Sequence, residues 1–188
     1  MLPGTSEPIA EETILWVRWN AAALQARPRL EQAIADFDPG SLPAAQAAAR
    51  WLRADGLGGE SQPYLAVVDD EVVGFYALTV GQVILSSHHR KKLDLTFSTQ
   101  GAVLLTWIAK SARHKIDGGL LVTDAIGVAL EIAAQASATV FALDPYDEPT
   151  AEMWKSRYAM RESQTELKAR DGEPVLRRLY VPLSKPAA

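Results

Sequence analysis

Apolar and polar positions change their period several times along the chain, and each period predicts an element. Residues 13–20, TILWVRWN, are rich in strand-forming residues and alternate as a strand does. Residues 28–37 and 42–53 carry apolar positions at helical spacing and predict two helices. The segment DFDPGS, residues 36–41, separates them because proline and glycine together interrupt a helix.

The clearest local pattern is YLAVVDDEVVGFYALTV, residues 64–80. Two strand-like runs flank Asp69 and Asp70, which predicts an antiparallel hairpin with a short acidic turn. Residues 101–109, GAVLLTWIA, form a near-continuous apolar run, as a strand buried on both faces does. The middle of the chain is therefore expected to supply the centre of a sheet.

The remaining pattern predicts a long helix over 118–136, a buried strand over 138–145 and a last strand over 175–183. Between those two strands, Pro149 and Thr150 open a helix that is expected to end near Arg157. The order of elements predicts a mixed α/β sheet rather than a doubly wound parallel one, because the hairpin requires antiparallel pairing.

Composition fits one domain of an ordinary globular protein. The 188 residues are 48% hydrophobic and 22% charged, which we interpret as a flexible N-terminal arm at 1–12 followed by a single domain at 13–188. No apolar stretch reaches the roughly 18 residues of a membrane span, and the acidic N-terminus does not resemble a signal peptide. Cysteine is absent, which excludes disulfides and a cysteine nucleophile, so a cytoplasmic location without membrane attachment is expected.

Charge is unevenly distributed within the net charge of −4. All three histidines and six basic residues lie between His88 and Lys115, where the only acidic residue is Asp94. This stretch is either a solvated face or a local positive field for an anionic ligand. Under the second interpretation, three of its residues are candidates for contact with an anionic substrate: Arg90, Lys91 and Lys92.

Two other kinds of site are disfavoured by the sequence. His88 and His89 are adjacent, so on a strand their side chains would project to opposite faces, and His114 is the only other histidine. Without cysteine, no metal site is expected. The serines before these histidines, Ser86 and Ser87, are not surrounded by the G-x-S-x-G pattern of a serine hydrolase.

The segment between the apolar run at 101–109 and the helix at 118–136 resembles the cofactor loop of the GNAT N-acetyltransferase superfamily. In that family the pattern Gln/Arg, two residues, Gly, one residue, Gly/Ala binds the pyrophosphate of acetyl-coenzyme A through loop amides and a helix N-terminus. Here the string is RHKIDG at 113–118: Arg113 and Gly118 match, whereas Ile116 replaces a glycine and Asp117 adds a negative charge. The resemblance assigns ten residues to cofactor binding: Ile108, Ala109, Lys110, Arg113, His114, Lys115, Ile116, Asp117, Gly118 and Gly119.

A narrower resemblance links the chain to the GNAT toxins of bacterial toxin–antitoxin pairs. It rests on DFDPG at 36–40, RWLR at 50–53 and VVGFYALTVGQV at 72–83, and it extends over about residues 36–183. Pro39 stands where those toxins usually have cysteine. The resemblance implies a GNAT fold, with a mixed sheet of about six or seven strands flanked by about four helices.

The family's last helix carries a tyrosine that protonates the departing coenzyme A thiolate. The corresponding segment here is MWKSRYAM at 153–160, in which Trp154 or Lys155 takes the tyrosine position, depending on the register. Tyr158, one helical turn later, is the first candidate substitute and Tyr146 the second, although either could be an ordinary boundary tyrosine with a solvated hydroxyl.

The resemblance implies an acetyl-CoA-dependent, toxin-like N-acetyltransferase that acetylates a primary amine, with the α-amine of an aminoacyl-tRNA as one acceptor. A small antitoxin protein and a homodimer are the expected partners. Two alternatives remain open: a catalytically impaired GNAT-fold protein that acts in binding or assembly, and an acetyltransferase for a small amine or a protein N-terminus.

The substitution at residue 116 leads to one further expectation. A β-branched side chain at this position would hinder close approach of the backbone to phosphate, and Asp117 would repel it. The loop is therefore expected to bind pyrophosphate less tightly than a complete motif, and Ile116→Gly is expected to tighten binding. If that change had no such effect, residues 111–119 would be the entry to a core helix or a loop for another ligand.

Overall fold

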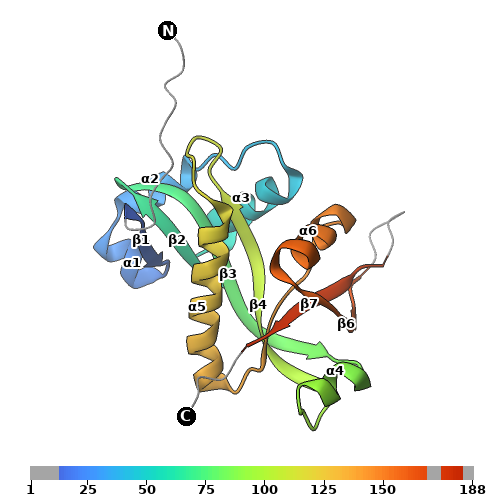
Figure 1. Cartoon of the computed structure of the whole chain (residues 1–188). Helices are drawn as coiled ribbons and strands as arrows, with labels where there is room; N and C mark the ends of the chain where they lie inside the picture. Colours follow the sequence, from blue (N-terminus) through green and yellow to red (C-terminus); the bar gives the residue numbers. More distant parts are fainter. Residues whose placement is uncertain (1–12, 169–174, 184–188) are drawn as a thin grey trace. The chain divides into compact units, whose positions relative to one another are not determined.

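The computed structural model describes residues 13–168 and 175–183, so the predicted arm at 1–12 lies outside the described residues. The chain forms a seven-stranded mixed sheet in the order β1-β2-β3-β4-β5-β7-β6, together with six helices (Figure 1). The strands are β1 Leu15–Arg18, β2 Gln62–Val68, β3 Glu71–Ile84, β4 Thr99–Lys110, β5 Val140–Leu143, β6 Arg161–Glu166 and β7 Arg177–Pro182. The helices are α1 Ala21–Ala26, α2 Arg29–Ala35, α3 Pro43–Asp55, α4 Ser87–Lys92, α5 Gly118–Ala136 and α6 Glu148–Tyr158. This architecture confirms the predicted mixed α/β class.

Two compact units divide the described residues. The first takes the described part of Met1–Leu78 together with Thr106–Ala125, and the second takes the described parts of Thr79–Leu105 and Ile126–Ala188. The strands β3 and β4 and the helix α5 contribute residues to both units. The interpretation of 13–188 as a single domain stays a prediction.

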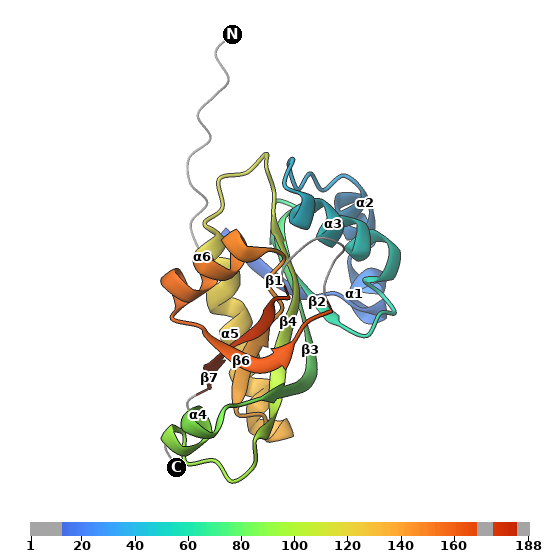
Figure 2. The ribbon, with the colours of Figure 1, turned by 90° about the vertical axis from the view of Figure 1, so that its right-hand side faces the viewer.

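In the first unit, the strands β1 to β3 are covered on both faces. Helices α1, α2 and α3 lie on one face, and the beginning of α5 lies on the other (Figure 2). The face towards α1–α3 is packed with large apolar side chains, among them Trp19, Leu30, Phe37, Leu52 and Phe75. Burial of apolar surface on both faces is the main stabilising contribution to this unit.

The hairpin between β2 and β3 has the predicted acidic turn. Asp69 and Asp70 both have positive φ, 50° and 64°, which is the conformation of a type I′ turn and matches the twist of the flanking strands. A register shift opposite Ala66 and Val67 marks a bulge in β3, where Val73 has no Cα partner on β2. The two aspartates adopt the left-handed region because their short polar side chains tolerate it better than most residues.

The second unit has its own apolar cluster, formed by β3, β4, β5 and β7 with the segment after β3. Its buried members are Val83, Leu85, Ala102, Val140, Ala142 and Tyr180. Strands β4 and β5 pair in parallel from Ala102↔Val140 to Leu105↔Leu143, and β5 pairs antiparallel with β7. Arg178 on β7 holds Asp144 at the end of β5 with two hydrogen bonds of 2.6 and 2.8 Å.

Three elements were not predicted: α1, α4 and β6. Helix α1 is short and is capped by Asn20, whose side chain accepts a hydrogen bond from the Ala23 N–H at 3.0 Å. Strand β6, RESQTE, has no apolar residue to give a strand signal. Helix α4 contains His88 and His89, so their expected placement on a strand is wrong.

Helix α5 is long and apolar enough to cross a membrane by length and composition alone, with 19 residues and a mean hydropathy of 1.4. The sequence prediction that no apolar stretch reaches this length differs from this finding, because α5 meets the criteria although it contains Asp124 and Glu131. Core helices of soluble proteins meet the same criteria, so this feature is weak evidence for a membrane span.

Candidate functional site

The loop between β4 and α5, residues 111–117, is held by its backbone to two other parts of the first unit. The Ser111 N–H donates to the Val73 carbonyl at 2.8 Å, and the Ala112 N–H donates to the Asp38 carbonyl at 2.8 Å. The loop is therefore attached to β3 on one side and to the segment after α2 on the other.

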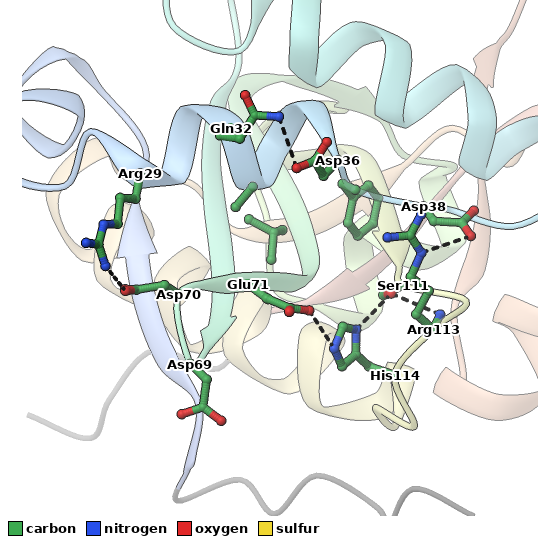
Figure 3. Close-up of a pocket in the computed structure, with 13 residues that line it drawn as sticks. Arg29, Gln32, Asp36, Asp38, Asp69, Asp70, Glu71, Ser111, Arg113 and His114 are labelled. Atoms are coloured by element: carbon green, nitrogen blue, oxygen red, sulfur yellow. Dashed lines mark hydrogen bonds and ion pairs between the residues drawn. The ribbon is translucent and has the colours of Figure 1, made fainter. Parts of the chain in front are cut away.

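Side chains of the loop continue this attachment through the His114 imidazole (Figure 3). Its Nδ1 lies 3.0 Å from the Ser111 Oγ, and its Nε2 lies 3.0 Å from a Glu71 carboxylate oxygen. When Nε2 carries the proton and donates to Glu71, Nδ1 accepts from the Ser111 hydroxyl. The same Ser111 oxygen accepts from the Arg113 N–H at 3.1 Å, so these contacts orient the backbone at Arg113.

Three cations of the loop region were predicted to bind cofactor. The Arg113 guanidinium is largely exposed and lies 3.5 Å from an Asp38 carboxylate oxygen. The Lys110 ammonium donates to the Ile116 carbonyl at 3.3 Å, and Lys115 is exposed. Such exposed pairs are weak in water, so Arg113 can exchange Asp38 for an anionic ligand at little cost.

Ile116 does not stand where a ligand would approach. Its side chain is 2% exposed and belongs to a core cluster with Ile14, Val73 and Leu121. The expectation that this side chain hinders a phosphate is therefore wrong. The β-branched residue anchors the loop to the core, and the hydrogen bonds of Ser111 and His114 hold the loop as well.

The N-terminus of α5 already has an acidic cap. The Asp117 carboxylate accepts a hydrogen bond from the Gly119 N–H at 2.9 Å, as an N-terminal capping residue does. A Cβ added at Gly118 would meet no atom within 4 Å, so this side of the helix start is open to a ligand. Asp117 therefore competes with an external anion for the Gly119 amide. The space beside Gly118 stays accessible to a ligand.

A cavity of about 520 Å³ adjoins the loop within the first unit (Figure 3). It is lined by Ser111, Arg113 and His114 of the loop together with residues of α2 and the β2–β3 turn. Five carboxylates also line it: Asp36, Asp38, Asp69, Asp70 and Glu71. The surroundings of Arg113 are thus more acidic than the positive field proposed for the 88–115 stretch.

The predicted substrate residues lie on α4, in the second unit, whereas Lys110, Arg113 and Lys115 lie in the first. The Arg90 guanidinium donates to the Thr96 carbonyl at 2.6 Å, and Lys91 and Lys92 are exposed. The basic stretch is therefore divided between two elements of different units.

Helix α6 contains most of the segment 153–160, which corresponds to the part of the GNAT fold that carries the catalytic tyrosine. Trp154 is buried, and the Lys155 ammonium forms ion pairs with Glu152 and Glu162, so neither residue offers a free acid group. Tyr158 is the last residue of α6, and its ring lies 4.8 Å from that of Trp154 and 5.7 Å from the Arg157 guanidinium. Tyr146 lies half-buried in the loop between β5 and α6.

Asp38, Glu71 and Ser111 shape the loop but were not among the candidates. Asp38 lies in the DFDPG segment, which carried part of the resemblance, so a signal for it existed in the sequence. Glu71 had none, because its contact with His114 joins residues that are distant in sequence, whereas Ser111 lies only three residues before His114 but matches no position of the motif. In the described residues, no three His, Asp or Glu side chains gather in a way that could hold a metal ion.

Neither a family model nor a curated protein matches the chain. Solved structures do match. A bacterial toxin is 16% identical with a TM-score of 0.64, covering 94% of this chain and 92% of the toxin. AtaT complexed with acetyl-methionyl-tRNAfMet is 17% identical with a TM-score of 0.56, covering 79% and 86% of the two chains. A mutant AtaT toxin bound to the C-terminus of the antitoxin AtaR and acetyl-CoA is 16% identical with a TM-score of 0.52, covering 80% and 85%.

At this identity the likeness concerns the fold, and it extends over most of each chain compared. The predicted GNAT fold is confirmed at that level. The chain therefore has the fold of the GNAT-type toxins.

Proposed function

We propose that this chain is an acetyl-CoA-dependent N-acetyltransferase of the toxin type, with a primary amine as acceptor. The observation that carries the proposal is the shared fold, since structures of this fold include an AtaT toxin bound to acetyl-CoA and AtaT with acetyl-methionyl-tRNAfMet. The α-amine of an aminoacyl-tRNA is accordingly the acceptor we propose first. A cytoplasmic location, a homodimer and a small antitoxin partner belong to the same proposal.

The residues of the β4–α5 loop fit a bound pyrophosphate. Arg113 and Lys115 are exposed cations, and the helix start is open at Gly118. A helix N-terminus favours phosphate through its free N–H groups and its dipole. The Asp117 cap reduces this capacity by one amide, at Gly119, but leaves the two cations and the open side in place.

Acetyl-CoA, when bound, supplies an acetyl group on a thioester. The backbone of Ile108, Ala109 and Lys110 on β4 would orient that thioester through N–H groups, which any side chain at these positions permits. The β4–β5 register ends at Leu105↔Leu143, before these three residues. Tyr158 or Tyr146 would return a proton to sulfur. Because a thiol with a pKa near ~8.5 can leave as thiolate, a weak acid slows transfer by at most about 10²–10⁴-fold.

The test is calorimetric titration of the full chain with coenzyme A. Arg113→Ala is expected to weaken binding by about 1.5–3 kcal/mol, the contribution of a charge-assisted hydrogen bond. The double change Arg90→Ala with Lys91→Ala is the control: it should leave coenzyme A affinity intact and weaken an anionic acceptor. Equal losses of coenzyme A affinity in both variants would refute the assignment of Arg113 to the cofactor and of Arg90 and Lys91 to the acceptor. No binding at millimolar coenzyme A would refute the proposed acetyltransferase function.

A second candidate is a GNAT-fold protein without catalysis that acts in binding or assembly. It is favoured by the burial of Trp154 and by the Asp117 cap. Release of coenzyme A in the presence of a panel of amines would exclude it. An expression experiment separates the aminoacyl-tRNA acceptor from a small amine or a protein N-terminus. Growth arrest on expression that a co-expressed antitoxin relieves supports the tRNA acceptor.

A further inference from the structure

Two polar side-chain atoms of the second unit are buried with no hydrogen bond of ordinary geometry among the described residues, and their rings lie beside each other. One is the hydroxyl of Tyr180 on β7, a residue with 0% exposure, and the other is Nδ1 of His89 on α4. The two rings meet edge to face, with centroids 5.9 Å apart and an interplanar angle of 66°. Buried polar atoms are nearly always paired in folded proteins, so two neighbouring exceptions require an explanation.

The charges that act on this pair are all positive. Arg161 on β6 is the Cα partner of Tyr180 in the β6–β7 register, and its charge affects both Tyr180 and His89. His88 and Lys92 affect His89 from its own helix. Burial is the first cause that lowers the pKa of His89, and these three cations lower it further. Burial raises the pKa of Tyr180, and the charge of Arg161 together with a hydrogen-bonding contact from its guanidinium partly offsets this, so the hydroxyl keeps its proton and remains a donor.

The side chains of Tyr180, His89 and Arg161 offer hydrogen-bond donors, and the charged groups near them are positive. The Tyr180 hydroxyl donates, the His89 ring donates from Nδ1 in one tautomer or when protonated, and Arg161 offers a guanidinium. Arg161 makes no ion pair with any residue in the described ranges 13–168 and 175–183. Donors from three elements, α4, β6 and β7, suit the several oxygens of a tetrahedral oxyanion better than the two oxygens of a carboxylate.

We propose that His89, Tyr180 and Arg161 form a binding site for a phosphoryl group. Tyr180 is fully buried whereas the neighbouring His89 side chain is partly exposed, so a ligand would enter at His89. The proposal does not depend on acetyl transfer or on the β4–α5 loop. Free phosphate and the phosphodiester of a nucleotide chain present the same oxygens, and the experiment separates these two sources.

The experiment follows the His89 ring signals of the full chain by NMR during titration with inorganic phosphate and, separately, with a short RNA dinucleotide. Saturable shifts and a rise in the pKa of His89 are expected, because a bound anion stabilises the imidazolium. Tyr180→Phe should weaken binding about tenfold or more, the effect of losing one hydrogen bond to a charged group. Lys168→Ala removes one exposed positive charge from the second unit, outside both the pair and the residues proposed to contact the acceptor, and should leave affinity unchanged.

Saturation with phosphate alone identifies the free anion as the ligand, and saturation with the dinucleotide identifies a phosphodiester. Shifts that never saturate with either probe overturn the site. Equal losses of affinity in Tyr180→Phe and Lys168→Ala also overturn it, because they indicate general charge attraction. Arg161→Gln, on an element outside the apolar cluster, gives an independent variant: it must weaken binding as well if the site exists.

Discussion

The Asp117 carboxylate and the Gly119 backbone are joined by a hydrogen bond of 2.9 Å at the first turn of α5. An anion supplied by the protein therefore already binds one of the amides that a phosphate would use. The same contact stabilises the helix, because the first amides of a helix have no intrahelical partner. Stability of α5 and affinity for an external anion are thus opposed at this residue.

Replacing Asp117 with alanine should separate these two effects. We expect Asp117→Ala to lower the free energy of unfolding by about 0.5–2 kcal/mol, as loss of an N-cap does. Coenzyme A should bind more tightly, because an amide is freed and a repelling charge is removed. Urea denaturation and calorimetric titration measure the two quantities on the same preparation.

The control for this prediction is Glu131→Ala, which removes an exposed negative charge from the same helix far from its start. It should change neither quantity appreciably. If Asp117→Ala weakens coenzyme A binding in a folded protein, Asp117 does not compete with the ligand.

Ile116 should affect stability rather than affinity. Ile116→Ala removes a side chain that is 2% exposed and should lower the free energy of unfolding by about 2–5 kcal/mol, whereas Ile116→Val should cost about 0.5–1.5 kcal/mol. The valine variant keeps the loop folded, so its coenzyme A affinity should equal that of the original chain. A clear gain in affinity in a folded Ile116→Ala variant, which no longer has a β-branched side chain, would restore the interpretation that this side chain hinders the ligand.

Elements with a strong local signal were predicted well from the sequence. The Asp69–Asp70 turn and the helix α5, Gly118–Ala136, agree with the expected positions because turn chemistry and apolar spacing are local properties. Strand β6 was missed because its pairing with β7, rather than any apolar residue of its own, makes it a strand. Helix α4 was missed because a polar, capped six-residue helix has no apolar face to detect.

At the candidate site, the sequence motif alone did not determine where the side chains point. The RHKIDG string identified the correct loop between a strand and a helix start, but not the direction of each side chain. Ile116 points into the core, and His114 binds Glu71 from another strand. Such contacts depend on how β3 and the loop approach each other, which no spacing within the motif encodes.

Arg178 should be one of the strongest polar contributors to the second unit. Its guanidinium donates twice to Asp144, at 2.6 and 2.8 Å, and once to the Gln82 carbonyl at 2.8 Å. The hydrogen bonds to Asp144 raise the pKa of Arg178, and burial opposes them. Arg178→Ala should lower the free energy of unfolding by about 1.5–3 kcal/mol, as for hydrogen bonds to charged groups.

The neighbouring arginine gives a matched control. Arg177 lies half-exposed, with its guanidinium 3.8 Å from a Glu166 oxygen, and exposed pairs of this kind contribute about 0–1 kcal/mol. Arg177→Ala should therefore leave the urea midpoint nearly unchanged. Similar midpoints for both variants would show that Arg178 does not stabilise the unit through its bidentate contact.

The last prediction concerns pH and His89. Burial, followed by Arg161, His88 and Lys92, lowers the pKa of this imidazole below its ordinary value of 6.5. The unfolded chain therefore binds more protons than the folded one below that value, and the free energy of unfolding falls as the pH drops. The contribution is fully present above a pH of about 6.5 and is lost progressively as the pH falls through the lowered pKa.

His89→Asn should remove this dependence, while His88→Asn, a change at the exposed neighbouring ring, should retain most of it. The measurement is urea denaturation between about pH 5 and 8 in a buffer without phosphate. Phosphate must be absent because an oxyanion held by Tyr180 and Arg161 would raise the pKa of His89 and oppose the loss of stability at low pH. A pH dependence that is identical in the original chain and in His89→Asn would show that another group causes it.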